Sequence, residues 1–254
     1  MACIGIFDSG SGGLSVLKEI LKVLPSEKYI YFSDDAYCPY GGRSREYIID
    51  RSLKIVESLV DEGAQAIVVA CNTATGAAIQ TLRENWPDIP FIGMEPAIKP
   101  AVALSRKAVV GVLATESTLH SEKYLHTKQA CARGLKVVER VGEGFVELVE
   151  GGRTSGPEAE AVVERSLRPI LSAGADVVVL GCTHYPFLLP VMKKIAGPDI
   201  DFLDPAPAVA RHLVELLEAQ KIPFGKGELS VEIKSSGSAE TARRLYDNII
   251  KLAL

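Results

Sequence analysis

The chain has 254 residues, with 28 Lys and Arg against 32 Asp and Glu. This length suits one large domain or two modest ones, each with a buried core. A formal net charge of −4 gives no electrostatic reason to expect a nucleic acid or a membrane surface as partner. The start of the chain lacks the basic and apolar segments of a secretory signal, and no apolar run approaches the roughly 20 residues that cross a bilayer. We therefore expect a cytoplasmic protein.

The first half of the chain alternates strand and helix patterns. Strands are expected at 4–7, 29–32, 66–70 and 91–93, and helices at 14–24, 44–62, 75–84 and 98–105. Residues 34–43, with Pro39 and two glycines, are expected to form a loop. The continuous apolar run at 66–70 is typical of a strand buried on both faces.

The second half repeats this alternation. Strands are expected at 109–114, 136–140, 176–180, 201–203 and 229–234, and helices from about 117 and at 156–172, 190–195, 206–220 and 239–254. Strands that alternate with helices predict mainly parallel sheets with helices on both sides.

The two halves resemble each other in sequence. Residues 63–73 (GAQAIVVACNT) match residues 174–184 (GADVVVLGCTH), and in both a Gly-Ala pair starts eight positions before a cysteine. The shift is 111 residues. We therefore predict an α/β protein of two pseudosymmetric domains with open, mainly parallel sheets.

The repeat changes how the five cysteines are interpreted. An odd number cannot be fully paired in disulfides, and no two cysteines have the C-x-x-C spacing of a zinc knuckle or a dithiol motif. Cys71 and Cys182 fall at the carboxyl ends of equivalent strands, where open parallel sheets bind ligands. Two such domains facing each other place both thiols at one cleft, which we predict to be the active site. Cys3, Cys38 and Cys131 are expected to be incidental.

Two opposed thiols suggest a particular chemistry. One activated cysteine is typical of nucleophilic catalysis. A pair can invert a stereocentre, because one thiolate removes a proton from one face of a carbon while the other thiol protonates the opposite face. The sequence has no obvious pyridoxal-phosphate lysine and no cluster of metal ligands, which agrees with chemistry that uses neither a cofactor nor a metal.

Four motifs in chain order carry a resemblance to a known family: DSGSGGL at 8–14, Asp34 with Pro39-Tyr40-Gly41, ACNTA at 70–74, and GCTHYP at 181–186. Together they resemble the cofactor-independent glutamate racemases of the aspartate/glutamate racemase superfamily, from Ile4 to about Pro205. The resemblance implies interconversion of L- and D-glutamate, with D-glutamate supplied to peptidoglycan. It also implies discontinuous domains, the first formed by 1–97 and 208–254 and the second by 98–207. Tyr37-Cys38 departs from the family's usual residues before the Pro-Tyr-Gly.

The resemblance also implies roles for single residues. Cys71, assisted by Asp8, would remove the α-proton of D-glutamate. Cys182, assisted by His184, would remove that of L-glutamate. The substrate's amino and carboxylate groups would be held by Asp8, Ser9, Tyr40, Gly41, Asn72, Thr73, Thr183 and His184. Glu150 looks like the family's acidic residue of the second domain, with Glu147 as an alternative.

Other interpretations stay open at this stage. The enzyme could instead be an aspartate or hydantoin racemase of the same superfamily. A protein of another class, a non-catalytic two-domain binder of a small amino acid, would need no reactive cysteines. Residues 8–13 could bind a phosphate at a helix N-terminus, although they lack the Gly-Lys-Ser/Thr of a P-loop. The expected partner is a small molecule, glutamate, and a homodimer is left open.

Overall fold

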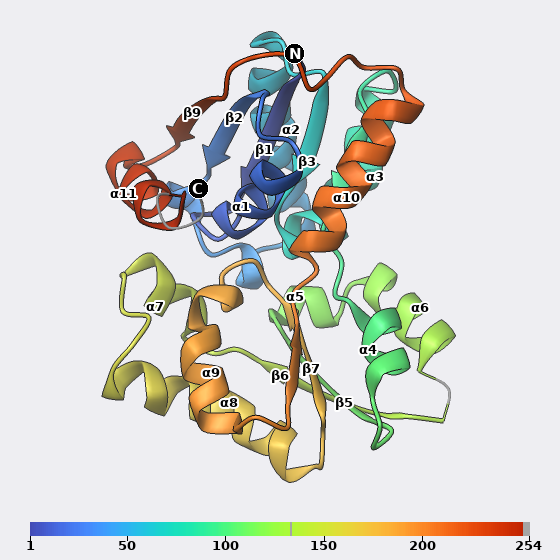
Figure 1. The fold of residues 1–254 in the computed structure, drawn as a ribbon, viewed down its shortest axis with the longest axis vertical. Helices are drawn as coiled ribbons and strands as arrows, with labels where there is room; N and C mark the ends of the chain where they lie inside the picture. The colour runs from blue at the N-terminus through green and yellow to red at the C-terminus, as the bar shows by residue number, and fades with distance from the viewer. Residues whose placement is uncertain (133, 251–254) are drawn as a thin grey trace. The chain divides into compact units, whose positions relative to one another are not determined.

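A computed structural model describes residues 1–132 and 134–250 of the chain. These residues divide into two compact units. The first unit contains Met1–Met94 and the described residues from Ala206 onward, and the second is Glu95–Pro205. Each unit is built on a parallel sheet with helices on both faces (Figure 1), which confirms the predicted fold class. Among the described residues, no helix is both long and apolar enough to span a bilayer.

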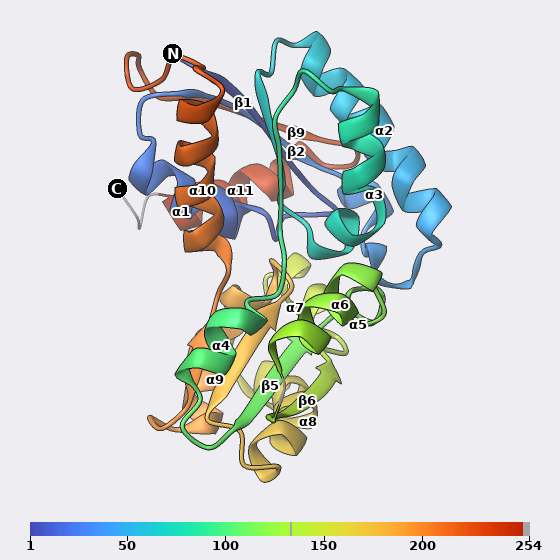
Figure 2. The same cartoon turned by 90° about the vertical axis from the view of Figure 1, so that its right-hand side faces the viewer.

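The first unit has a sheet in the order β4-β3-β1-β2-β9. Its strands are β1 (Cys3–Asp8), β2 (Lys28–Ser33), β3 (Ala66–Val69), β4 (Phe91–Gly93) and β9 (Ser230–Ser235). Helices cover both faces of this sheet (Figure 2). One face carries α1 (Leu14–Val23), α10 (Ala206–Ala219) and α11 (Ala239–Ile250), and the other carries α2 (Arg45–Asp61) and α3 (Asn72–Asn85). The last four positions of the helix expected at 239–254 lie outside the described residues.

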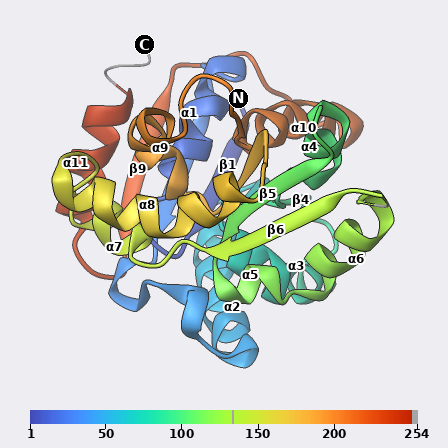
Figure 3. The same ribbon diagram turned by 90° about the horizontal axis from the view of Figure 1, so that it is seen from below.

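The second unit has a sheet in the order β6-β5-β7-β8. Its strands are β5 (Val109–Ala114), β6 (Lys136–Val141), β7 (Val177–Gly181) and β8 (Asp201–Leu203). Figure 3 shows β5 and β6 side by side. The helices are α4 (Ile98–Leu104), α5 (Glu116–Leu119), α6 (Glu122–Cys131), α7 (Phe145–Glu150), α8 (Pro157–Ser172) and α9 (Leu189–Ala196). The helix expected from about 117 is therefore two helices, α5 and α6, and α7 was not expected.

The sequence repeat reappears in the pairing of the strands. The order β4-β3-β1-β2 corresponds to β8-β7-β5-β6. Ile4 pairs with Ala66 in the first sheet, and Val110 pairs with Val177 in the second, so the same register recurs. The partners Ala66 and Val177 differ by the 111 positions that also separate the two cysteines. The predicted pseudosymmetry is confirmed at the level of single residues.

The repeat extends to the buried faces of the helices. In α2 the buried residues are Ile48, Ser52, Ile55, Val56 and Leu59. In α8 they are Ala159, Val163, Ser166, Leu167 and Ile170, each 111 positions later. Equivalent helices therefore present equivalent faces to equivalent sheets.

The helix that follows the last strand of each copy is exchanged. α4 follows β4 along the chain but packs on α6 and β7 of the second unit. α10 follows β8 but packs on α1 and β4 of the first unit. The units change over after Met94 and after Pro205, again 111 positions apart. Each copy of the repeat thus supplies a helix to the sheet of the other.

Candidate active site

Cys71 lies in the first unit, directly after the buried strand β3, and it is 5% exposed. It is the N-cap of α3, and its sulfur accepts the backbone N–H of Ala74 at 3.4 Å. Its thiol also lies 3.8 Å from the hydroxyl oxygen of Ser9. Backbone N–H groups and the dipole of a helix N-terminus favour the thiolate form of a cysteine. The fold therefore gives Cys71 surroundings that suit an acid–base residue.

Asp8 ends β1, and its side chain is fully buried. Its carboxylate accepts the backbone N–H groups of Gly10 at 3.3 Å and Gly13 at 3.0 Å. A Cβ atom at Gly13 would lie 2.8 Å from the Cβ of Asp8, so this close approach needs a glycine. Two N–H groups of the glycine-rich loop are therefore bound to Asp8. This weakens the interpretation of residues 8–13 as a phosphate-binding loop.

Asn72 and Thr73 open α3 and are almost completely buried. Neither the oxygen nor the nitrogen of the Asn72 side-chain amide has a hydrogen-bond partner among the described residues. Burying an unpaired amide is unfavourable, and such groups in folded proteins usually have a reason. The amide next to Cys71 is therefore well suited to pair with a polar ligand.

Tyr40 and Gly41 lie in a short 3-10 turn, Tyr40–Gly42, within the loop after β2. The Tyr40 side chain is buried in the same apolar cluster as Cys71. Its hydroxyl donates a hydrogen bond to Asp34, whose carboxylate is fully buried. Burial and this hydrogen bond raise the pKa of Tyr40 above its ordinary value, so the hydroxyl stays protonated and acts as a donor.

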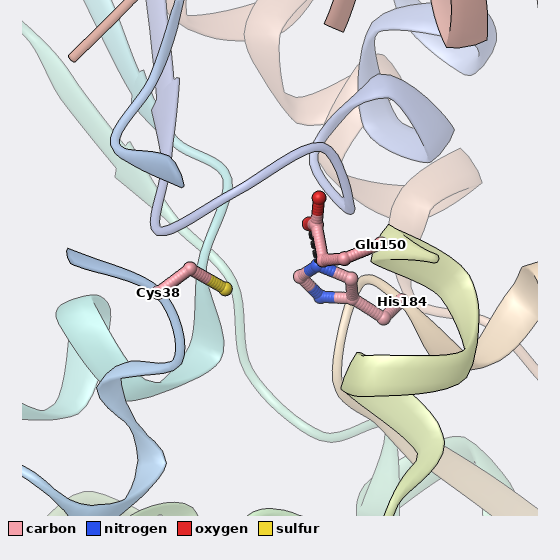
Figure 4. A group of neighbouring side chains, drawn as sticks. All are labelled: Cys38, Glu150 and His184. Atoms are coloured by element: carbon pink, nitrogen blue, oxygen red, sulfur yellow. Dashed lines mark hydrogen bonds and ion pairs between the residues drawn. The ribbon is translucent and has the colours of Figure 1, made fainter. Parts of the chain in front are cut away.

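Cys182 lies in the second unit, directly after β7, and it is 8% exposed. Its sulfur lies 3.7 Å from Nδ1 of His184, a side chain that is itself 1% exposed. Nε2 of His184 lies 2.6 Å from Oε1 of Glu150, as the dashed line in Figure 4 shows. A carboxylate at Nε2 favours the tautomer of a neutral ring with its proton there, and Nδ1 is then the nitrogen that can accept a hydrogen bond from the thiol. These three side chains form a chain of contacts that ends at the sulfur.

Of the two glutamates expected as alternatives, Glu147 and Glu150, it is Glu150 that contacts His184. Both belong to α7, the helix that sequence reasoning missed. Phe145 at the start of α7 packs edge-on against the ring of Tyr185, with ring centroids 4.9 Å apart. This contact places α7 against the segment that carries His184. The apolar pattern at 145, 146, 148 and 149, between Gly144 and Gly151, was the available signal for α7.

The site residues expected from the sequence thus form two groups. The first unit contains Asp8, Ser9, Tyr40, Gly41, Cys71, Asn72 and Thr73, and the second contains Glu150, Cys182, Thr183 and His184. Sequence reasoning missed Arg51, which binds Asp34. Thr115, which the 106-residue shift between β1 and β5 makes the counterpart of Ser9, caps α5 with its side chain.

The chain is similar to known proteins along almost its whole length. A family model for Asp/Glu/Hydantoin racemase matches residues 4–213. The glutamate racemase of Methylococcus capsulatus is 48% identical, over 95% of this chain and 89% of its own length. The structure of Escherichia coli glutamate racemase with L-glutamate is similar at a TM-score of 0.88 and 31% identity, over 98% of this chain and 95% of that one. The structure of the Francisella tularensis enzyme with D-glutamate has a TM-score of 0.84 at 29% identity, over 98% of this chain and 94% of that one. Sequence and fold agree along nearly the whole length, and the chain belongs to the Asp/Glu/Hydantoin racemase family.

Proposed function

We propose that this protein is a glutamate racemase that interconverts L- and D-glutamate with two cysteines as its acid and base. The observation that carries the proposal is the equivalence of Cys71 and Cys182, which follow equivalent strands of the repeat in the same register. The choice of glutamate is supported by relatives named glutamate racemase and by related structures that contain D- or L-glutamate.

In the proposed reaction, the thiolate of Cys71 removes the α-proton of D-glutamate, and the electron pair of the broken C–H bond stays on the substrate. The thiol of Cys182 then donates its proton to the opposite face of the same carbon, which gives L-glutamate. Cys71 is left as a thiol and Cys182 as a thiolate. This protonation state is the one that the reverse reaction needs, so the roles exchange with direction.

The helper groups differ between the two cysteines. His184 accepts the proton of Cys182 through Nδ1, and Glu150 holds the ring in the tautomer that can do so. On the other side, Asp8 assists Cys71 from the end of the neighbouring strand β1, and the N-terminus of α3 favours the thiolate. We propose Asp8, Ser9, Tyr40, Gly41, Asn72, Thr73, Thr183 and His184 as the groups that hold the substrate.

Removing the α-proton of an amino acid leaves carbanion character that must be stabilised. Preorganised hydroxyl and amide donors aimed at the substrate carboxylate can spread this charge. The unpaired amide of Asn72 is such a group, and it lies next to Cys71 in the sequence. We therefore assign Asn72 to a substrate carboxylate or amino group.

The proposal extends to the setting of the reaction. We propose that the two units act as the two domains of the enzyme and that its D-glutamate supplies peptidoglycan synthesis. The mechanism needs reduced thiols, and none of the five cysteines forms a disulfide in the described structure. Because reducing compartments keep thiols free, we propose that the enzyme works in the cytoplasm.

Exchange in D₂O tests the proposal directly. Purified protein without added cofactor is incubated with L- or D-glutamate, and the optical rotation and the deuterium content at Cα are measured. We expect loss of rotation together with incorporation of deuterium from both enantiomers. Aspartate and a hydantoin are run in parallel, and reaction of either one in place of glutamate would overturn the substrate assignment. Binding of glutamate without exchange would favour a non-catalytic binding protein.

A further inference from the structure

A buried carboxylate lies behind the proposed substrate loop. Asp34 directly follows β2, and its side chain is fully buried. An uncompensated charge at such a place is strongly unfavourable, so the carboxylate needs a positive partner or must lose its charge. None of the catalytic roles proposed above uses this group. Its function must therefore be sought in the residues that bind it.

Arg51, from the second turn of α2, supplies the partner. Its Nε donates to Oδ2 of Asp34 at 3.0 Å, and its Nη2 donates to Oδ1 at 2.6 Å. This two-point pairing orients the carboxylate as well as balancing its charge. Cζ of the guanidinium also lies over the ring of Tyr37, 3.7 Å from the ring centroid, in a cation–π contact. Arg51 is thus held between the loop residue Tyr37 and the buried Asp34.

The pairing reaches the proposed substrate groups through one further contact. Oδ2 of Asp34, the oxygen that accepts from Nε of Arg51, also accepts the hydroxyl of Tyr40. The Tyr40 ring is 1% exposed and packs in the cluster that contains Cys71. A fixed Asp34 therefore fixes the Tyr40 side chain and, with it, the backbone of Tyr40 and Gly41.

We propose that Arg51 is a positioning residue that sets the substrate-binding geometry of Tyr40 and Gly41 through Asp34. This inference rests on the proposed function, because it assigns that function's loop a dedicated support. It also gives Tyr37 a role, because its ring packs on the guanidinium, at a position where the sequence departs from the family's usual residues. The expected signature is a change in substrate binding that exceeds the change in the chemical step.

The test compares Arg51→Met with the double variant Arg51→Met, Asp34→Asn. Met keeps an unbranched apolar stem but leaves the Asp34 carboxylate without a counter-charge. Asn at position 34 removes that charge and keeps an oxygen that can accept from Tyr40. We expect Arg51→Met to raise KM for both enantiomers about tenfold or more, with a smaller change in kcat, since small displacements of a binding group have effects of this size. The double variant should recover most of the loss.

Two further variants keep the test decisive. Arg51→Lys keeps the charge without the planar fork and should give an intermediate KM, and it replaces Arg51→Met if that variant does not fold. Lys54→Met removes an exposed ion pair with Asp50 on the same helix, at 2.8 Å, and should leave KM unchanged. All variants are assayed at a temperature at which circular dichroism shows them folded.

The outcomes separate this inference from the proposed function. If the wild-type protein does not racemise glutamate, the proposed function fails and this inference fails with it. If the wild-type protein is active and folded Arg51→Met has an unchanged KM, only the inference is overturned. A double variant with a KM as high as that of Arg51→Met would also overturn it, because Arg51 would then not act through Asp34.

Discussion

The two units place a cysteine at the same point of the same fold but surround it differently. Cys71 caps a regular α-helix of 14 residues and accepts a backbone N–H from its first turn. Cys182 precedes a 3-10 turn, Tyr185–Leu188, and its sulfur faces the imidazole of His184. One thiol thus lies at a helix N-terminus, and the other lies beside an imidazole that also contacts a carboxylate.

The repeat shows which positions carry this difference. The position equivalent to Asp8 in the second unit is Ala114, 106 residues later, and it has no side chain that can titrate. The position equivalent to His184 in the first unit is Thr73, 111 residues earlier. The fold and its register are shared, whereas the proposed helper groups lie at or just after the ends of strands that are not equivalent in the repeat. The repeat therefore accounts for the equivalent placement of the two thiols, and the different residues at these positions account for their different surroundings.

The largest expected effect tests whether both thiols are needed. Cys71→Ser and Cys182→Ser should each lower the racemisation rate about 10³-fold or more, because a hydroxyl is a far weaker acid than a thiol. Polarimetry with each enantiomer measures the rate. Cys131→Ser, which changes a cysteine outside the site, should keep the rate within about twofold of wild type. A single-cysteine variant that retains a tenth of the activity would contradict the two-base mechanism.

A smaller loss of activity is expected from substituting His184, and it should distinguish the surroundings of Cys182 from those of Cys71. His184→Asn is expected to lower kcat/KM about 10²-fold, and equally in both directions, because the equilibrium constant between enantiomers is one. The difference between the two cysteines should appear instead in the primary kinetic isotope effects. Because proton transfer at Cys182 becomes rate-limiting, the isotope effect with α-deuterated L-glutamate should rise, and the isotope effect with α-deuterated D-glutamate should fall.

Glu150→Gln should shift the isotope effects in the same directions but less, since it disturbs only the orientation of His184. Equal shifts for both enantiomers in the His184 variant would show that His184 does not serve Cys182 alone.

Much of the fold was predictable because its signals are local. Buried parallel strands appear as continuous apolar runs, such as 66–70, and amphipathic helices alternate with them. The helix α7 was missed because its six residues give less than two turns of periodicity. The start of α3 was predicted three positions late, since a cysteine is not among the usual N-cap residues.

The candidate site was also predictable only in part. Motifs placed Cys71, Cys182 and their sequence neighbours at strand ends, and their roles stay predictions. Glu147 and Glu150 are three positions apart on one helix, and only the contact with His184 distinguishes them. Arg51 is 17 positions from Asp34, and no spacing rule joins a loop residue to the middle of a following helix. Tertiary packing alone brings these two together.

Replacing two equivalent glycines, Gly5 and Gly111, tests how closely the two copies of the repeat match in packing. A Cβ at Gly5 would lie 2.6 Å from Cδ1 of Ile67, and one at Gly111 would lie 2.3 Å from Cγ2 of Ile170. Replacement by Ala should lower the free energy of unfolding by about 1–3 kcal/mol at each position. The loss should be larger at Gly111, because Cγ2 on a branched carbon is less free to move than the far end of a side chain. Urea unfolding measures both, and a smaller loss at Gly111 would contradict the argument.

The smallest expected effect is a difference in the free energy of unfolding between variants of Asp176 and of its counterpart Gln65, 111 positions earlier. Asp176 is 1% exposed and accepts the Ser105 hydroxyl at 2.6 Å and the backbone N–H groups of Arg106 and Lys107 at 2.7 and 3.0 Å. The exposed side chain of Gln65 accepts a single backbone N–H at 3.2 Å. Asp176→Asn should therefore lower the free energy of unfolding by about 1–3 kcal/mol at neutral pH, and Gln65→Ala by about 1 kcal/mol or less.

The pH dependence sharpens this last comparison. Burial acts to raise the pKa of Asp176, but the hydrogen bonds from Ser105 and the two backbone N–H groups outweigh it and hold the pKa below its usual value. A carboxylate with a lowered pKa in the folded state stabilises the protein above its unfolded pKa of about 3.9, and this contribution is lost as the pH falls through the folded value. Urea unfolding at neutral pH and below about pH 4 should show the gap between wild type and Asp176→Asn narrowing in acid. The gap for Gln65→Ala should stay constant, since no charge is involved, and an equally constant gap for Asp176→Asn would mean that the charge of Asp176 contributes nothing.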